Sequence, residues 1–210
     1  IFEANRAEEN GISGKEENRG FFVADRTGCV LAASDPDDVG RRMNGPGMAM
    51  LARIFEQQAH ISHPFWDGGL FQGAPVRVGI PRMIAAAAVK DEQGAALAAL
   101  AIVLDPQEDF SRILSIARIG ETGNTYAFDK HGVLLSDSRF EPELRRIGLL
   151  PDTDDAQSTL NIEIRDPGGD LTRGYVPRRP RAEQPLTRMA ASAATGASGM
   201  DLAGYRDFRG

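Results

Sequence analysis

The sequence predicts an α+β protein of two tandem modules, each an antiparallel sheet flanked by helices, with a helix joining the two. Three observations lead to this prediction. A short hairpin motif recurs four times, apolar runs of strand length flank it, and segments with helical periodicity lie between the hairpins. The two modules are predicted to comprise residues 1–112 and 113–210.

Each copy of the motif has Asp at its first position and Gly at its fourth. The copies occupy residues 25–28, 91–94, 129–132 and 207–210. The Asp side chain accepts hydrogen bonds from the backbone of its own turn, and Gly adopts the left-handed conformation that closes a tight hairpin. The alternative is a surface loop in which Asp and Gly occur together by chance, and a single copy would be weak evidence against it. Four copies favour the hairpin.

The flanks of the first and third copies also agree. In residues 21–34 and 125–138, an aromatic residue lies three positions before Asp, a cation follows Asp directly, and Ser lies nine positions after it. The third copy follows the first by about 100 residues, and the fourth follows the second by slightly more. A duplicated module of about 100 residues, within the usual size range of domains, explains both offsets if the second module carries a modest insertion.

In the first module, apolar runs predict four strands and the spacing of apolar residues predicts one helix. The strands are expected at residues 20–25, 29–34, 80–90 and 95–104, and the helix at 48–59. Ala prefers helices, so the Ala-only stretch within the third strand is ambiguous. The turn that follows it, and the apolar run after the turn, favour a strand.

A further helix is predicted to lead out of the first module. Asp105 is placed as its N-cap and Pro106 at its first position, and apolar residues follow at helical spacing. In the second module we expect helices at 140–147 and from Pro185 onward, a basic loop at 178–181 that is exposed to solvent, and strands at 124–129, 133–136, 158–164, 171–177 and 200–206.

The last predicted strand ends in the fourth turn, where the sequence stops. Its hairpin partner is therefore missing, which would leave an open sheet edge. The sequence also begins at Ile1 rather than Met. We expect either that the native chain continues or that another chain covers the edge.

Composition excludes several classes of protein. The chain has 24 basic and 30 acidic residues, a net charge of −6, which argues against binding of nucleic acid through a cationic surface. A content of 41% hydrophobic residues is too high for a disordered chain. The single cysteine, Cys29, cannot form an internal disulfide. The longest apolar run, residues 95–104, is about half the length of a membrane-spanning helix, and no signal peptide is visible.

Two segments, residues 22–28 and 119–132, resemble the double Cache family, the extracytoplasmic PAS-like sensor modules of membrane receptors. The resemblance extends from about residue 20 to the end of the chain. It implies a membrane-distal module at 1–112 that holds a small organic ligand, and a membrane-proximal module at 113–210 that is incomplete at its C-terminus. It further implies a periplasmic or extracellular location, transmembrane helices outside this sequence, and a cytoplasmic kinase, cyclase, diguanylate cyclase or chemotaxis output.

The sequence departs from the family at both ends. Members of the family begin with a long helix, through which they dimerise, but Gly11, Gly14 and Gly20 each disfavour a helix there. At the C-terminal end, no segment corresponds to residues 95–118 of the first module. Whether the chain forms a homodimer is therefore left open.

The sequence contains no arrangement that indicates catalysis, and we expect no enzyme activity, metal or cofactor. His60 and His63 are close together but lack a third predicted ligand, and His131 is placed in an exposed turn. Nucleophile, zinc-protease and phosphate-loop motifs are absent from the sequence.

The residues expected to bind a ligand lie in the first module. Phe65, Trp66 and Phe71 belong to a segment dense in large side chains, which either rims a pocket or fills the space between helix and sheet. Arg77 and Arg82 could bind a ligand carboxylate or lie exposed on the surface.

Asp105 has two readings, as the N-cap already described or as a ligand residue. The resemblance implies the second, because amino-acid-binding members of the family use an Asp at this place for the amine of the ligand. Those members also carry Arg-x-Trp-Tyr upstream, where this chain has His-Pro-Phe-Trp-Asp at residues 63–67. The ligand could therefore be another small organic molecule.

These observations favour a non-enzymatic, extracytoplasmic sensing domain of a transmembrane signalling protein. The alternative is a ligand-free protein-interaction or spacer module of a membrane receptor.

Overall fold

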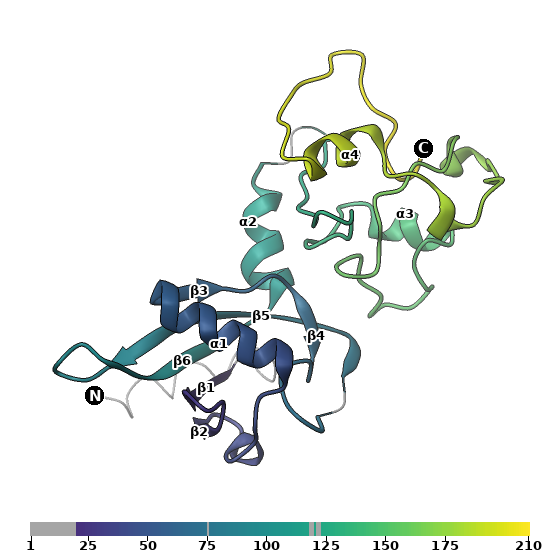
Figure 1. Ribbon diagram of the computed structural model, residues 1–210. Coiled ribbons are helices and arrows are strands. Elements are labelled where there is room, and N and C mark those ends of the chain that lie inside the picture. The colour runs from purple at the N-terminus through teal and green to yellow at the C-terminus, as the bar shows by residue number, and fades with distance from the viewer. Residues whose placement is uncertain (1–19, 75, 118–119, 121–122) are drawn as a thin grey trace. The chain divides into compact units, whose positions relative to one another are not determined.

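The structure is a computed structural model that describes residues 20–74, 76–117, 120 and 123–210 (Figure 1). The chain is an α+β protein, as predicted. It divides into two compact units. Unit 1 comprises the described residues up to 62 together with 68–76 and 82–105, and unit 2 comprises 63–67, 77–81 and the described residues from 106 to 210. The predicted boundary between residues 112 and 113 stays a prediction.

A single antiparallel sheet with the strand order β2-β1-β6-β5-β3 dominates the first half of the chain, and β4 also pairs with β5. All four strands predicted for this half are confirmed. The Ala-rich stretch lies within the long β5, and the short β3 and β4 were not predicted. The strands are β1 (Gly20–Asp25), β2 (Val30–Ala33), β3 (Ala59–Ile61), β4 (Phe65–Asp67), β5 (Arg77–Lys90) and β6 (Ala96–Leu104).

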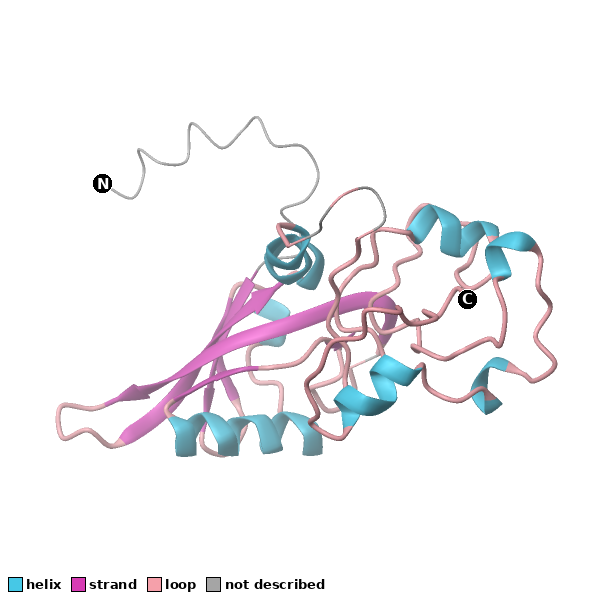
Figure 2. Ribbon diagram, turned by 90° about the horizontal axis from the view of Figure 1, so that it is seen from above, coloured by secondary structure: helices cyan, strands magenta, loops and turns pink. Residues whose placement is uncertain are grey.

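The two faces of the sheet differ in burial. Phe22 on β1 and Ala86 on β5 both lie opposite Ala101 on β6, and all three are buried on the same face. Helix α1 (Gly45–Gln57) lies along one face of the sheet in both views (Figures 1 and 2). Its buried residues Met50, Leu51 and Ile54 complete the core of unit 1. The opposite face leaves large apolar side chains exposed, among them Phe21, Leu100 and Ile102.

Helix α1 begins three residues earlier than predicted. The side chain of Asn44 accepts a hydrogen bond from Gly47 N at 3.0 Å, and Pro46 occupies the first turn. Gly47 is close to the backbone of Leu70 and to the side chain of Met43, so any larger residue would collide there. These capping residues set the start of the helix, whereas apolar spacing alone pointed to Met48.

All four Asp-x-x-Gly segments form the predicted turn, but the predicted hairpin of regular strands is confirmed only for the first two, since the third is flanked by an isolated bridge and no described strand precedes the fourth. In each, the Asp carboxylate accepts a hydrogen bond from the N–H two residues later, at 2.8–3.0 Å, and the Gly N–H donates to the Asp carbonyl. Each Gly has a positive φ, between 78° and 118°. In the first three copies the carboxylate also accepts from the residue after Gly, which extends the hairpin. In the fourth, the carbonyl of Arg209 accepts from Leu171 N instead.

A helical segment follows β6 where it was predicted, but its first part is a π-helix. The π-helix η4 (Pro106–Ser111) leads into the short α2 (Arg112–Ser115). Helix α3 (Glu141–Arg146) also lies where expected. Residues 1–19 and part of the segment 119–132 lie outside the described residues, so the predictions that concern them stay predictions.

The regular strands predicted after residue 120 are not found in the described chain, and isolated bridges take their place. Phe128 pairs with Leu134, and Val133 pairs with Glu163. The backbone of Leu134 also exchanges hydrogen bonds of 2.8 Å with Ile162 and Leu160. Polar side chains also accept hydrogen bonds from backbone N–H groups that strand pairing would otherwise use. Ala127 N, for example, donates to the hydroxyl of Ser136 at 2.9 Å. The segments predicted as strands 124–129 and 133–136 therefore form no regular strand. The strand predicted at 158–164 is wrong in its first half, where residues 158–161 form a turn and Leu160 has a φ of 61°.

Near the C-terminus two predicted strands are wrong, and one predicted helix is confirmed but starts later than expected. Residues 171–177 contain the 3-10 helix η5 (Leu171–Arg173), because the Asp170 side chain caps a tight turn that the left-handed Gly174 closes. Helix α4 (Arg188–Ala194) begins after Thr187 rather than at Pro185, because the Thr187 hydroxyl is its N-cap. Residues 200–206 form no strand, so the predicted open sheet edge does not arise.

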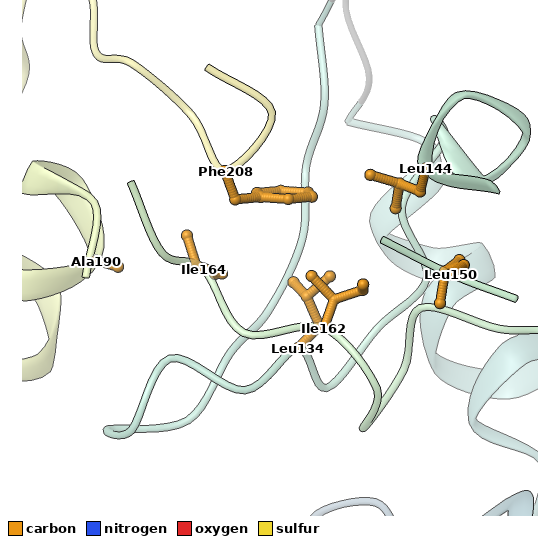
Figure 3. Close-up of a cluster of buried hydrophobic side chains, with 7 residues drawn as sticks. All are labelled: Leu134, Leu144, Leu150, Ile162, Ile164, Ala190 and Phe208. Carbon is orange, nitrogen blue, oxygen red and sulfur yellow. The ribbon is translucent and has the colours of Figure 1, made fainter. Parts of the chain in front are cut away.

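Unit 2 has its own hydrophobic core, shown in Figure 3. Phe208, the second residue of the fourth turn, is fully buried, and its ring meets that of Tyr126 edge to face at 5.9 Å between centroids. The core comprises Leu134, Leu144, Leu150, Ile162, Ile164, Ala190 and Phe208.

Candidate functional site

The candidate site in unit 1 begins with Arg82 and Asp105, at one end of the β5–β6 hairpin. The last registered pair of these strands is Met83 opposite Leu104, so the next positions outward are Arg82 and Asp105. Directly opposite residues of an antiparallel pair have Cβ atoms about 5 Å apart. The alternation of the strands puts both positions on the buried face of the sheet, and Arg82 is only 8% exposed. Both residues also make contacts within the protein.

This arrangement suits recognition of a small polar ligand. A guanidinium binds a carboxylate through two parallel hydrogen bonds, and a carboxylate such as that of Asp105 binds an ammonium group. The low exposure of Arg82 strengthens such contacts, because charges attract one another more strongly away from water. Asp105 directly precedes the π-helix η4, and π-helical turns occur frequently at functional sites.

Phe71 lies on the same face of the sheet but farther along it. Its ring packs edge to face against Phe22, with centroids 5.5 Å apart. Phe22 belongs to the row of Ala101 and Ala86, which lies four residues from the row of Arg82, or about 13 Å along the strands. Phe71 therefore covers the middle of the buried face, and the charged residues stand at its end.

The other three predicted ligand residues belong to unit 2. Phe65 and Trp66 lie on β4 and are half-buried. Arg77 is the first residue of β5, and its side chain lies outside the described part of the structure. That these three share one pocket with Phe71, Arg82 and Asp105 stays a prediction.

Sequence reasoning missed a cluster of buried hydroxyl groups and carboxylates in unit 2. The Thr159 hydroxyl donates to Asp137 at 2.6 Å, and Asp137 N donates to the Ser111 hydroxyl at 2.9 Å. The N–H and hydroxyl of Ser158 both donate to Glu141, at 2.7 and 2.9 Å. The available signal was the polar run Ser-Asp-Ser at residues 136–138, directly after an apolar hairpin strand.

Burial raises the pKa of Glu141, and the nearby charge of Asp137 raises it further. The two hydrogen bonds from Ser158 and the charge of Arg145 oppose this shift. Protonation of Glu141 is thus easier than for an exposed glutamate.

Among the described residues, no group of three or more His, Cys, Asp or Glu side chains could hold a metal ion. No described helix is long and apolar enough to span a membrane.

Comparison with known proteins adds little. No protein-family model and no curated protein matches the chain. Among solved structures, the chain is similar to "VqmA bound to DPO", with a TM-score of 0.33 and 12% sequence identity. The likeness covers 57% of this chain and 63% of that one, less than two thirds of its length. A TM-score this low supports no inference about function.

Proposed function

We propose that the chain is the extracytoplasmic sensing region of a transmembrane signalling protein, built from two tandem PAS-like modules that resemble the double Cache family. The sheet order, in which the first strand lies between the second strand and the last, is compatible with a PAS-like module. The observation that carries the proposal is the buried Arg82 beside Asp105 on the covered face of this sheet. A small ligand with a carboxylate would bind there.

The position of Asp105 offers a route for a signal. Asp105 links the last strand of the sheet to η4, the start of the segment that leaves unit 1. A ligand that contacts Asp105 stabilises one arrangement of this connection over another by its difference in affinity for the two. In this proposal the signal continues through the second module to a transmembrane helix outside the sequence.

A ligand screen tests the proposal directly. The melting temperature of the chain is measured by calorimetry in the presence of small carboxylic acids and amino acids. A specific ligand raises the stability by RT ln(1 + [L]/Kd). Arg82→Gln and Asp105→Asn should abolish the shift, whereas Arg53→Ala, which removes an exposed arginine from α1, should leave it unchanged.

Trp66→Ala tests the predicted participation of β4. If a ligand still binds to all three site variants, it binds elsewhere, and the site proposed for unit 1 is wrong.

The sequence of the complete gene tests the proposed extracytoplasmic location of the chain. Transmembrane helices on either side of this segment and a cytoplasmic output domain are expected.

A second candidate is a ligand-free interaction module, and the exposed face of the sheet favours it. Phe21 lies directly opposite Ile102, both side chains are about half exposed, and Leu100 is exposed on the same face. Exposed apolar patches of this kind often mark interaction sites. If Phe21→Asp abolishes self-association in sedimentation experiments and no small ligand raises the melting temperature, this candidate replaces the sensor.

A further inference from the structure

Unit 2 contains an open groove of about 290 Å³. Its walls come from the turn at residues 166–168 and from the chain between residues 175 and 185. The groove is lined by Asp166, Pro167, Gly168, Tyr175, Arg178, Arg179, Gln184 and Pro185.

Backbone hydrogen bonds and close packing fix the walls of this groove. Asp166 N donates to the carbonyl of Pro185 at 2.8 Å, which ties one wall to the other. Gly168, at φ +90°, donates its N–H to the Asp166 side chain. The ring of Tyr175 lies against Gly169, so closely that a Cβ at that position would come 2.8 Å from Cδ1 of the ring. Only glycine permits this contact.

The arginines near the groove fall into two groups. Arg165 is paired with Glu163 and also donates to the carbonyl of Gln184. Arg181 donates to the carbonyls of Glu163 and Phe208, at 2.6 and 3.2 Å. These guanidinium groups are occupied in holding unit 2 together.

Arg178 and Arg179 form the second group. Both are exposed, and within the described part of the chain neither guanidinium has a hydrogen-bond or ion-pair partner. The loop beneath them is held in place, because the buried Gln184 donates from Nε2 to the carbonyl of Arg179 at 3.0 Å. The acidic group in the groove, Asp166, is paired with Arg206 at 3.2 Å. The groove thus presents two available cations and a neutralised acid.

We propose that this groove binds a small organic anion, with a carboxylate held by Arg178 and Arg179 and an apolar body against Tyr175, Pro167 and Pro185. Guanidinium groups match carboxylates in geometry as well as charge. The apolar walls favour a ligand with a hydrophobic body over a simple inorganic ion. The site lies wholly in unit 2, so the proposal does not depend on the ligand proposed for unit 1.

Three probes separate the charge from the apolar body. Benzoate has both, benzamide has the ring without the charge, and inorganic phosphate has the charge without the ring. Each is titrated into ¹⁵N-labelled protein while the amide signals of Gly168, Gly169 and Tyr175 are followed. Benzoate is expected to shift these signals saturably, and the other two probes to bind more weakly.

The double variant Arg178→Ala/Arg179→Ala should weaken benzoate binding by about tenfold or more. The matched control is Arg53→Ala/Arg173→Ala, which removes the same charge from exposed sites outside the groove and should retain binding. Circular dichroism checks that both variants fold. The proposal is overturned if benzoate gives no saturable shift, if benzamide or phosphate binds as tightly, or if the control loses as much affinity as the double variant.

Discussion

The two halves of the molecule use the same turn but build different structures around it. In unit 1, the turns at Asp25 and Asp91 join regular strands of one sheet. In unit 2, the turn at Asp129 has the same carboxylate hydrogen bonds, yet its two arms meet at an isolated bridge, Phe128 to Leu134, and form no regular strands. The four residues of the motif are therefore enough to form the turn, but they are not enough to form a sheet around it.

What differs is the sequence next to the turn. Beyond Gly94, uninterrupted apolar residues continue to Leu104, and from Ala98 to Val103 each of them pairs with β1 on one side and β5 on the other. Beyond Gly132, three apolar residues lead into Ser136, Asp137 and Ser138, around which hydroxyl groups accept the N–H bonds that a ladder would use. Regular pairing therefore stops within a few residues.

The largest expected effect comes from Phe208. Phe208→Ala removes a fully buried ring from the core of unit 2 and should cost about 3–5 kcal/mol of unfolding free energy. Native-state hydrogen exchange should show lost protection at Leu134 and Ile164 but not at Ala101 in unit 1.

Phe21→Ala is the control for that experiment. This side chain is 44% exposed on the sheet of unit 1, so a smaller loss is expected. If Phe208→Ala reduces protection equally at Ala101, the two units unfold as one body and the contrast between them is lost.

The next effect compares two turn glycines. Gly94→Ala and Gly132→Ala both force a side chain into the left-handed region, at φ 84° and 83°, which costs about 1–2 kcal/mol. The new methyl group is unobstructed at Gly94 but meets Leu186 at Gly132. Urea denaturation should therefore show the larger loss for Gly132→Ala. Equal losses would mean that Leu186 moves aside freely.

A third effect concerns pH. The raised pKa of Glu141 means that the folded state favours the protonated acid, so its ionisation destabilises the fold as pH rises above the ordinary value of 4.5. In Glu141→Gln, the amide oxygen still accepts from Ser158. The stability of this variant relative to the wild type should increase between acid and neutral pH, as measured by urea denaturation at a series of pH values. A constant difference would contradict the assignment.

The smallest effect is at the first turn. Hydrogen bonds from the Thr27 hydroxyl and from Cys29 N lower the pKa of Asp25, so stability is lost as pH falls through that pKa. The third turn has His131 in place of Thr27. Thr27→Val should raise the pKa of Asp25 toward its ordinary value in an NMR titration. An unchanged pKa would show that backbone donors alone hold the carboxylate.

Local sequence signals predicted much of this fold. The Asp-x-x-Gly turns need only their own residues, and the strands around Asp25 and Asp91 follow from the apolar runs on either side of those turns. The predictions fell short where one polar side chain decided the outcome. The caps Asn44 and Thr187 place the starts of α1 and α4 at other residues than predicted. The cap Asp170 starts a 3-10 helix where a strand was predicted.

The candidate site could be predicted only in part. The positions of Arg82 and Asp105 at the end of a hairpin follow from strand lengths, but nothing local in the sequence indicates that Arg82 is buried. In the groove of unit 2, Arg178 and Arg179 were visible in the sequence as a basic loop. Nothing local indicated that Tyr175, across the groove, would pack on Gly169.

The solitary tryptophan gives the protein a built-in optical probe. Trp66 is the only residue of its kind in the chain, and it lies half-buried on β4. Excitation at wavelengths longer than those that tyrosine absorbs therefore produces fluorescence from Trp66 alone. Changes in emission wavelength or in quenching by iodide would report the environment of β4 without any label.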